Sequence, residues 1–184
     1  MPLSNRAVNI LTFWYDELTP KQWFKKSIEL DDQIKTRFAH DVERALGGQY
    51  DIWAGDSQGR LSLILLLDQF TRNIYRESPK SFAGDEMACA LSLRSVDDGT
   101  VAAEPEQTKR HFYLIPMMHS EDITIQNAAL PLFEQFTDQK TADYAKRHRD
   151  IIARFGHFPH RNVILGRPSS AEEQQFLGQR GSSF

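Results

Sequence analysis

An aspartate stands at a position of this sequence where the apolar pattern predicts a leucine. One face of a predicted helix carries Leu61, Ile64 and Leu65. The next residue on that face is Asp68, and Arg72 lies one helical turn further on. An ionised carboxylate in an apolar setting is costly unless it is paired and hydrogen-bonded. Asp68 is therefore either a buried residue that fixes the loop after it, or an acid, base or ligand anchor tuned by burial.

A histidine also lies on an apolar helix face. Tyr144, His148, Ile151 and Phe155 follow one another at steps of four, three and four residues. This spacing predicts that His148 points inward. An inward histidine is either a core residue with satisfied ring nitrogens or an acid or base, because its ordinary pKa lies near neutral pH.

A third polar group is the motif MMHSED at residues 117–122. We expect it to precede a helix capped by Ser120, because Glu121 and Asp122 suit the positive end of a helix dipole. His119 has no such explanation and is a candidate acid or base. The residues predicted to act as acids or bases are Asp68, His119, His148 and His160.

The segment RFGHFPHRN, residues 154–162, mixes histidine, arginine and asparagine with phenylalanine and proline. Between residues 144 and 167 six lysines and arginines face one aspartate, an excess of five positive charges in a chain of net charge -3. Forked guanidinium groups suit a carboxylate or a phosphate, although a solvated helix face explains the cations before residue 150. The residues predicted to bind such an anion are Arg72, Asn73, Arg154, Arg161, Asn162 and Arg167.

Metal and cofactor sites are not expected. His157 and His160 have two residues between them, but the HExxH arrangement and paired CxxC motifs are absent. The glycine-rich phosphate loops and the GxSxG turn are absent as well. Cys89 is the single cysteine, so no disulfide can form within the chain, and a thiol nucleophile has no supporting residues. The sequence therefore predicts neither a metal nor a cofactor.

Composition limits the classes of protein and partner. At 184 residues, with 40% hydrophobic and 26% charged residues, the chain is expected to form one domain over residues 1–184. Its net charge of -3 gives no drive for nonspecific nucleic-acid binding. The longest aliphatic run, residues 63–67, is far below the roughly 20 residues of a membrane span. The first residues do not resemble a secretory signal, so a cytoplasmic protein without membrane contact is expected.

The elements that must position these residues are helices. Apolar spacing and capping residues predict roughly eight helices and no strand, hence an all-α fold. The stretch GRLSLILLLDQF, residues 59–70, is apolar nearly all round and predicts a buried central helix, with a parallel strand as the alternative. The other predicted helices span residues 7–15, 31–46, 85–95, 105–113, 121–136 and 141–155, with capping motifs at Thr19 and at Ser170 and a kink or break at Pro131.

Three motifs, LLDQFTRNIYR (66–76), FYLIPMMHSED (112–122) and RFGHFPHRNVILGR (154–167), resemble the bacterial family named domain of unknown function 924. The likeness covers nearly the whole chain. It implies an all-helical fold similar to tetratricopeptide-repeat arrays and no established activity. Thr71 stands where the family usually has proline, and His157 where it usually has arginine. The second departure argues against a metal and favours a positively charged pocket wall.

Two functions fit these residues. The first is a helical binding module whose polar inner groove holds an anionic small molecule or an acidic peptide end. The alternative is a hydrolase or lyase that acts on an anionic metabolite, with a histidine as acid or base and an arginine holding the anion. Both require His119, His148 and residues 160–162 to meet Asp68, Arg72 and Asn73 at one concave, positively charged pocket. No feature of the sequence indicates an oligomeric state.

Overall fold

The computed structural model describes residues 3–179, 181 and 182, and all regular structure in this part of the chain is helical. The all-α prediction is confirmed. The longer α-helices are α1 (Asn5–Thr12), α3 (Ile28–Leu46), α4 (Ser57–Ile64), α6 (Asp85–Asp97), α8 (Gln107–His119), α9 (Ile123–Phe136), α10 (Gln139–Phe155) and α12 (Ala171–Leu177). The short ones are α2 (Pro20–Trp23), α5 (Thr71–Ile74), α7 (Thr100–Ala103) and α11 (Asn162–Leu165). These single turns explain why the helices outnumber those predicted.

Five further turns have a different pitch. Two are π-helical, η1 (Phe13–Glu17) and η3 (Leu65–Phe70). Three are 3-10 turns, η2 (Asp51–Gly55), η4 (Pro79–Phe82) and η5 (Pro159–Arg161). The π turn η3 matters most for the site, because Asp68 lies in it. Such wide turns within α-helices are frequent at functional sites.

The central helix is continuous from α4 through η3 to α5. Its start is capped by Asp56, whose carboxylate accepts a hydrogen bond from the backbone N–H of Gly59 at 3.0 Å. Every residue from Gly59 to Thr71 is buried, as expected of a helix that is apolar all round. The predicted buried helix is therefore confirmed and the strand alternative is wrong.

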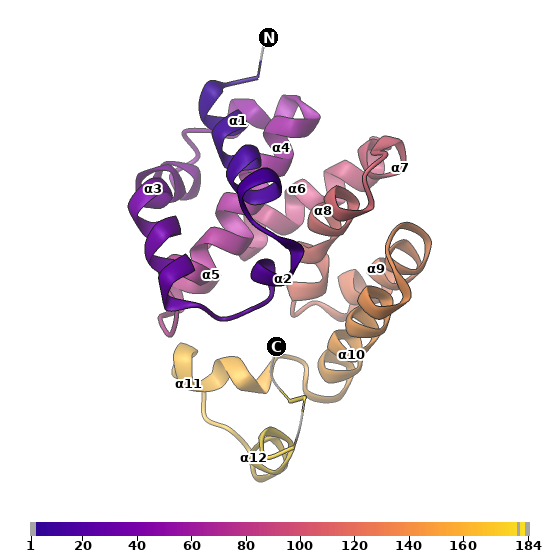
Figure 1. The fold of residues 1–184 in the computed structure, drawn as a ribbon. Helices are drawn as coiled ribbons and strands as arrows, with labels where there is room; N and C mark the ends of the chain where they lie inside the picture. Colours follow the sequence, from indigo (N-terminus) through magenta and orange to yellow (C-terminus); the bar gives the residue numbers. More distant parts are fainter. Residues whose placement is uncertain (1–2, 180, 183–184) are drawn as a thin grey trace.

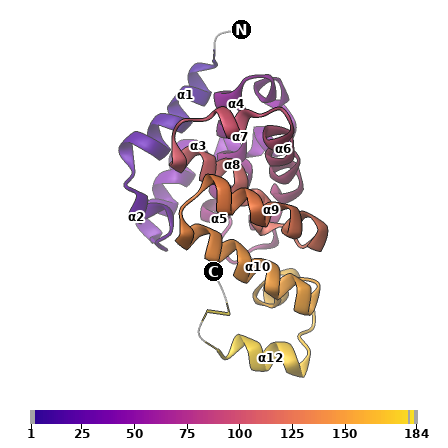
Figure 2. The ribbon, with the colours of Figure 1, turned by 90° about the vertical axis from the view of Figure 1, so that its right-hand side faces the viewer.

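Four of the longer helices flank this central helix, with α1 and α3 on one side and α6 and α8 on the other (Figure 1). One large cluster of buried apolar side chains fills the space between them. Beyond α8, the helices α9 and α10 pack against each other, and α12 lies at one end of the molecule in both Figure 1 and Figure 2. No helix among the described residues is both long and apolar enough to cross a bilayer.

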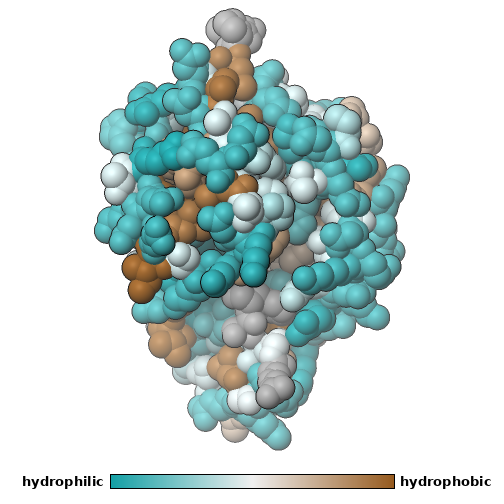
Figure 3. Space-filling model, viewed as in Figure 1, coloured by the Kyte–Doolittle hydropathy of each residue, from teal (hydrophilic) through white to brown (hydrophobic). Residues whose placement is uncertain are grey.

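The visible surface in Figure 3 is mostly hydrophilic, with hydrophobic side chains in small separate groups. This distribution follows from the burial of most large apolar residues in the core. The chain therefore resembles an ordinary globular protein on this face, and its unusual features are the polar groups inside.

Helix α8 differs from its predicted range of 105–113. It begins at Gln107 and continues through Pro116 to His119. The buried apolar residues on both sides of Pro116 stabilise the helix despite the missing N–H. His119 is consequently the last residue of a helix, and the prediction that it directly precedes one is wrong.

The caps of the next two helices also differ from the prediction. Asp122, not Ser120, caps α9 by accepting a hydrogen bond from the N–H of Thr124 at 2.7 Å. Asp138 caps α10 by accepting from the N–H of Thr141 at 2.8 Å, so Thr141 lies inside that helix. Helix α9 contains Pro131 and is one element rather than two.

The predicted capping motifs at the two ends of the chain are confirmed. Thr19 and Gln22 form a capping box for α2, and Ser170 and Glu173 form one for α12. In both cases the side chain of the capping residue accepts from the backbone N–H three residues later, and the side chain of that later residue accepts from the backbone N–H of the capping residue.

Candidate functional site

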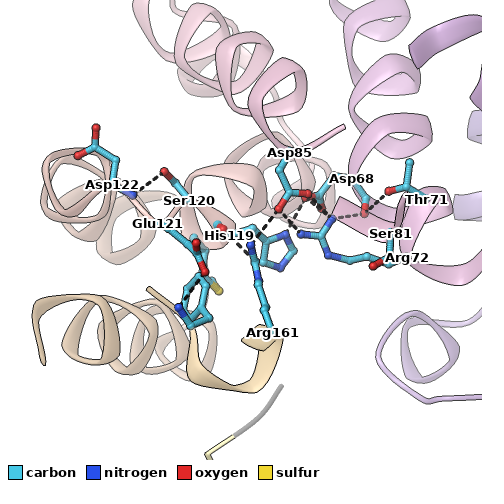
Figure 4. A network of polar contacts seen from close by, with 12 residues as sticks. Asp68, Thr71, Arg72, Ser81, Asp85, His119, Ser120, Glu121, Asp122 and Arg161 are labelled. Carbon is cyan, nitrogen blue, oxygen red and sulfur yellow. Dashed lines mark hydrogen bonds and ion pairs between the residues drawn. The ribbon is translucent and has the colours of Figure 1, made fainter. Parts of the chain in front are cut away.

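Five charged or polar side chains meet where the central helix approaches α6, α8 and η5 (Figure 4). We call this group the Asp68 cluster. Its members are Asp68, Arg72, Asp85, His119 and Arg161. They come from five elements spread over much of the chain, so the fold and not the local sequence brings them together.

The carboxylate of Asp68 orients the ring of His119. Asp68 is fully buried, and its Oδ1 lies 2.7 Å from His119 Nδ1. Burial lowers the pKa of His119, against the opposing effect of Asp68, so the ring is neutral near pH 7. Because an ionised carboxylate only accepts hydrogen bonds, Nδ1 must carry the proton. His119 Nε2 is then the basic nitrogen.

Three side chains keep Asp68 ionised. Burial alone would raise the pKa of Asp68, but the charge of Arg72 and the contacts with His119 and Gln69 hold it well below its ordinary value. Arg72 Nη1 lies 3.1 Å from Asp68 Oδ1, and Gln69 Nε2 donates to Oδ2 at 2.6 Å. Asp68 is thus buried and paired, as its place on an apolar face predicted, and Arg72 is one of its partners.

Asp85 connects the two arginines of the cluster. Arg72 lies 2.9 Å from its Oδ1 and donates to its Oδ2 at 3.0 Å. Arg161 donates to the same Oδ2 at 3.1 Å. The position of Asp85 depends on Gly84, where a Cβ atom would lie 2.2 Å from the carbonyl oxygen of Leu67. Glycine therefore lets the start of α6 approach the central helix closely enough for these contacts.

Arg161 reaches the cluster from η5 (Figure 4). Its guanidinium lies between the rings of Phe82 and Phe158, with its carbon 4.6 Å from each ring centre. It also donates to the main-chain oxygen of His119 at 3.0 Å. Arg161 Nε is buried and has no acceptor among the described residues. Burial, followed by the charge of Arg72, lowers the pKa of Arg161 to about 10.

Two more histidines lie beside the cluster. The ring centres of His119 and His148 are 6.3 Å apart, and Phe158 lies within 5.6 Å of both His148 and His160. Burial, with the positive groups nearby, lowers the pKa of His148 to about 3 and that of His160 to about 4. Both rings are therefore neutral near pH 7. His148 points inward as its spacing predicted.

Two of the predicted ligand-binding residues lie apart from the cluster. Asn73 donates to Asp31 at 2.8 Å. Arg154 pairs with Glu172 on the surface, where its side chain is half exposed. Asn73 lies apart from the cluster because it follows Arg72 by one residue and so faces a different side of the helix. Arg154 lies apart because it is on the solvent side of α10. The expectation that they share a pocket with Asp68 is corrected accordingly.

Asn162 and Arg167 belong to a second network. Arg167 binds Glu121 through two contacts of 2.7 and 3.0 Å, and its Nε donates to Asn162 at 3.0 Å. Asn162 also contacts Glu173, which in turn lies 2.5 Å from His157 Nε2. His157 therefore faces Glu173 and not the cluster. These contacts fix the fold of the chain end, so the predicted anion-binding role of Asn162 and Arg167 has no support in this geometry.

The sequence prediction missed Asp85, Gln69 and Glu121 as partners of the predicted residues. Asp85 and Glu121 stand next to helix starts, where an acidic residue needs no other explanation. Gln69 directly follows Asp68. Its position is the only sequence feature that could have indicated one of these three partners. Among the described residues no group of three or more His, Cys, Asp or Glu is arranged to hold a metal ion.

The cluster is almost closed. The exposed fraction is 0% for the Asp68 side chain, 7% for Arg161, 16% for His119 and Asp85, and 21% for Arg72. In place of the expected concave pocket, the structure has a group of side chains that largely cover one another.

The chain is similar to proteins whose function is unknown. A solved structure of a protein of unknown function from Agrobacterium tumefaciens shares 35% sequence identity, covers 94% of this chain and 96% of its own, and has a TM-score of 0.88. No curated protein matches the chain. Residues 10–181 match the family described as bacterial protein of unknown function, DUF924. The three motifs, this match and the solved structure agree, and the chain belongs to the DUF924 family.

Proposed function

We propose that this protein binds a small anionic molecule, a carboxylate or a phosphate, at the Asp68 cluster. The observation that carries the proposal is Arg161, a buried guanidinium whose Nε has no acceptor among the described residues. Its carboxylate partner, Asp85, is shared with Arg72. Asp68 also pairs with Arg72, so the two arginines face two carboxylates, and Arg161 Nε is the donor that remains for an added anion.

The neighbouring histidines add no charge to the cluster. His119 and His148 are neutral near pH 7 because burial and nearby positive groups lower their pKa values. The single N–H of each ring already faces an acceptor, Asp68 for His119 and the main-chain oxygen of Tyr144 for His148, so the arginines would bind the anion. The small exposed fractions of the cluster favour a ligand of a few atoms over the end of a peptide.

Calorimetric titration with inorganic phosphate and with citrate, at constant ionic strength, tests the proposal. We expect Arg161→Lys to weaken the binding by about tenfold or more, because an ammonium cannot reproduce the forked geometry. The matched control is Arg154→Lys, since Arg154 lies in an exposed pair with Glu172. Equal affinities of the wild type and both variants, or no binding of either anion, would contradict the proposal.

A second candidate function is acid–base catalysis on the bound anion, as a hydrolase or lyase. The contact of 2.7 Å between Asp68 Oδ1 and His119 Nδ1 favours it. The carboxylate accepts a hydrogen bond from the protonated ring nitrogen, so the second ring nitrogen is free to act as a base. Acid–base groups of this kind increase the rate about 100-fold to 10,000-fold in enzymes that use them.

Turnover of p-nitrophenyl phosphate and of hydroxy acids separates the two functions. We expect His119→Gln to abolish turnover while it leaves phosphate affinity within about threefold of the wild type. Binding without turnover in the wild type would leave anion binding as the function. Turnover that survives His119→Gln would exclude His119 as the acid or base.

A further inference from the structure

Arg161 and the segment that carries it close the cluster. We call residues 156–179, with η5, α11 and α12, the C-terminal segment. Arg161 is the member of the cluster that this segment contributes, and its side chain extends from η5 to Asp85 and His119 (Figure 4). The closed cluster described above leaves little room for a ligand, so an entering ligand requires movement of one of these elements.

A small apolar cluster, separate from the main core, joins the C-terminal segment to α10. Ile151, Ile152 and Phe158 are buried together, with Phe155 and Phe176 packed against them, separately from the main core. Figures 1 and 2 both show α12 at the end of the molecule, beyond α10. Opening of the segment about its junction with α10 would therefore disturb this small cluster and leave the main core intact.

Polar contacts supply much of the attachment of this segment to the other helices. Glu121 accepts from the backbone N–H of Phe158 at 2.8 Å and pairs with Arg167 through two contacts. The side chains of Arg167 and Glu121 are 29% and 27% exposed, so water can replace these contacts. The central helix, in contrast, is held by complete burial of its apolar residues.

Gly156 provides a place where the segment can turn. It follows the last residue of α10 and has a φ of +75°, a conformation that glycine adopts without strain. A Cβ at this position would meet no atom within 4 Å, so no side chain packs against Gly156 on that side.

We propose that the C-terminal segment opens as a unit about Gly156 and admits a small anion to the Asp68 cluster, and that closing returns Arg161 to its place beside the bound anion. The ligand class rests on the proposed function, whereas the opening does not. Complete burial of Phe158 keeps the open form a minor population.

Chemical modification of histidines by diethyl pyrocarbonate measures the opening without a ligand. In Arg167→Gln, which removes the contact with Glu121, we expect His119 and His148 to react at least about threefold faster than in the wild type. Arg37→Gln is the matched control, because Arg37 forms a similar forked pair with Glu17 far from the site. The exposed His40 serves as the internal reference and should react equally in all three proteins. Equal rates at His119 and His148 in the wild type and Arg167→Gln would overturn the proposal.

If Arg167→Gln does not fold, hydrogen exchange of the wild-type protein tests the opening instead. We expect the amides of η5, α11 and α12 to exchange together and about tenfold or more faster than those of α4 and η3. If the amides of the C-terminal segment and those of the central helix exchanged only when the whole protein unfolds, the proposal would be overturned. Opening without phosphate binding would contradict the anion-binding function alone, and phosphate binding without opening would contradict the opening alone.

Discussion

Asp85 and Arg161 are 76 residues apart in the sequence, and Arg161 Nη1 lies 3.1 Å from Asp85 Oδ2. This contact joins the first residue of α6 to η5. Because Asp85 also binds Arg72 of α5, one carboxylate connects the central helix, α6 and the chain end. The cluster is therefore both a candidate ligand site and a link between distant parts of the fold.

Replacing Asp85 tests this linking role. We expect Asp85→Asn to lower the free energy of unfolding by about 3 kcal/mol, because it leaves two largely buried guanidinium groups with less compensating charge. Urea denaturation followed by circular dichroism measures the change. The control is Glu17→Gln, which removes an exposed pair with Arg37 and should cost about 1 kcal/mol or less. Equal losses in the two variants would show that Asp85 has no special role.

The close approach of α6 to the central helix gives a second prediction. We expect Gly84→Ala to destabilise the protein by about 2 kcal/mol or more, because the new methyl group would overlap the carbonyl of Leu67. Gly55→Ala is the matched control, since a Cβ at Gly55 meets no atom within 4 Å. Thermal unfolding of the two variants should show a loss for Gly84→Ala only, and a loss of the same size for both would contradict the explanation.

The sequence predicts the contacts that are local and misses those that depend on packing. Asp68 and Arg72 are four residues apart on one helix, so their pairing follows from helical geometry. Asp85 joins them only because Gly84 permits a close approach between two helices, and no spacing within the sequence encodes that approach. The same reason explains why Glu121 was predicted only as a helix-start residue, although it binds Arg167.

Helix ends show the same limit. The central helix was predictable because an uninterrupted apolar pattern determines its burial. The start of α9 offers two capping residues, Ser120 and Asp122, within three positions. Ser120 instead accepts a hydrogen bond from the N–H of Asp122 in the turn before the helix. Which of the two residues caps the helix depends on the path of the preceding chain. The end of α8 depends on packing as well, because the helix extends to His119 only where its last turn is buried.

The buried neutral histidines predict sensitivity to acid. The pKa values of His148 and His160, about 3 and about 4 in the folded protein, lie below the unfolded value near 6.5. Between these values the unfolded chain binds protons that the folded chain does not, so stability is present above pH 6.5 and is lost as the pH falls. From pH 7 to pH 5 each histidine should lower the free energy of unfolding by roughly 2 kcal/mol.

Urea denaturation at several pH values measures this dependence. The free energy of unfolding should fall less between pH 7 and pH 5 in His148→Gln than in the wild type. The difference should be the contribution of one histidine, roughly half of what His148 and His160 contribute together. His40→Gln, at an exposed position, is the control variant. A slope that is identical in the wild type and His148→Gln would exclude His148 as a buried neutral group.

The tautomer of His119 is the most direct test of the Asp68–His119 pair. Because the ionised carboxylate of Asp68 only accepts hydrogen bonds, the neutral ring of His119 should carry its proton on Nδ1 in the wild type. Nitrogen-15 NMR of the imidazole distinguishes this form from the Nε2–H form that free histidine prefers. In Asp68→Asn the carboxylate that raises the pKa of His119 is lost, so the pKa of His119 should fall further below its ordinary value. An Nε2–H ring in the wild type would remove His119 Nε2 from consideration as a base.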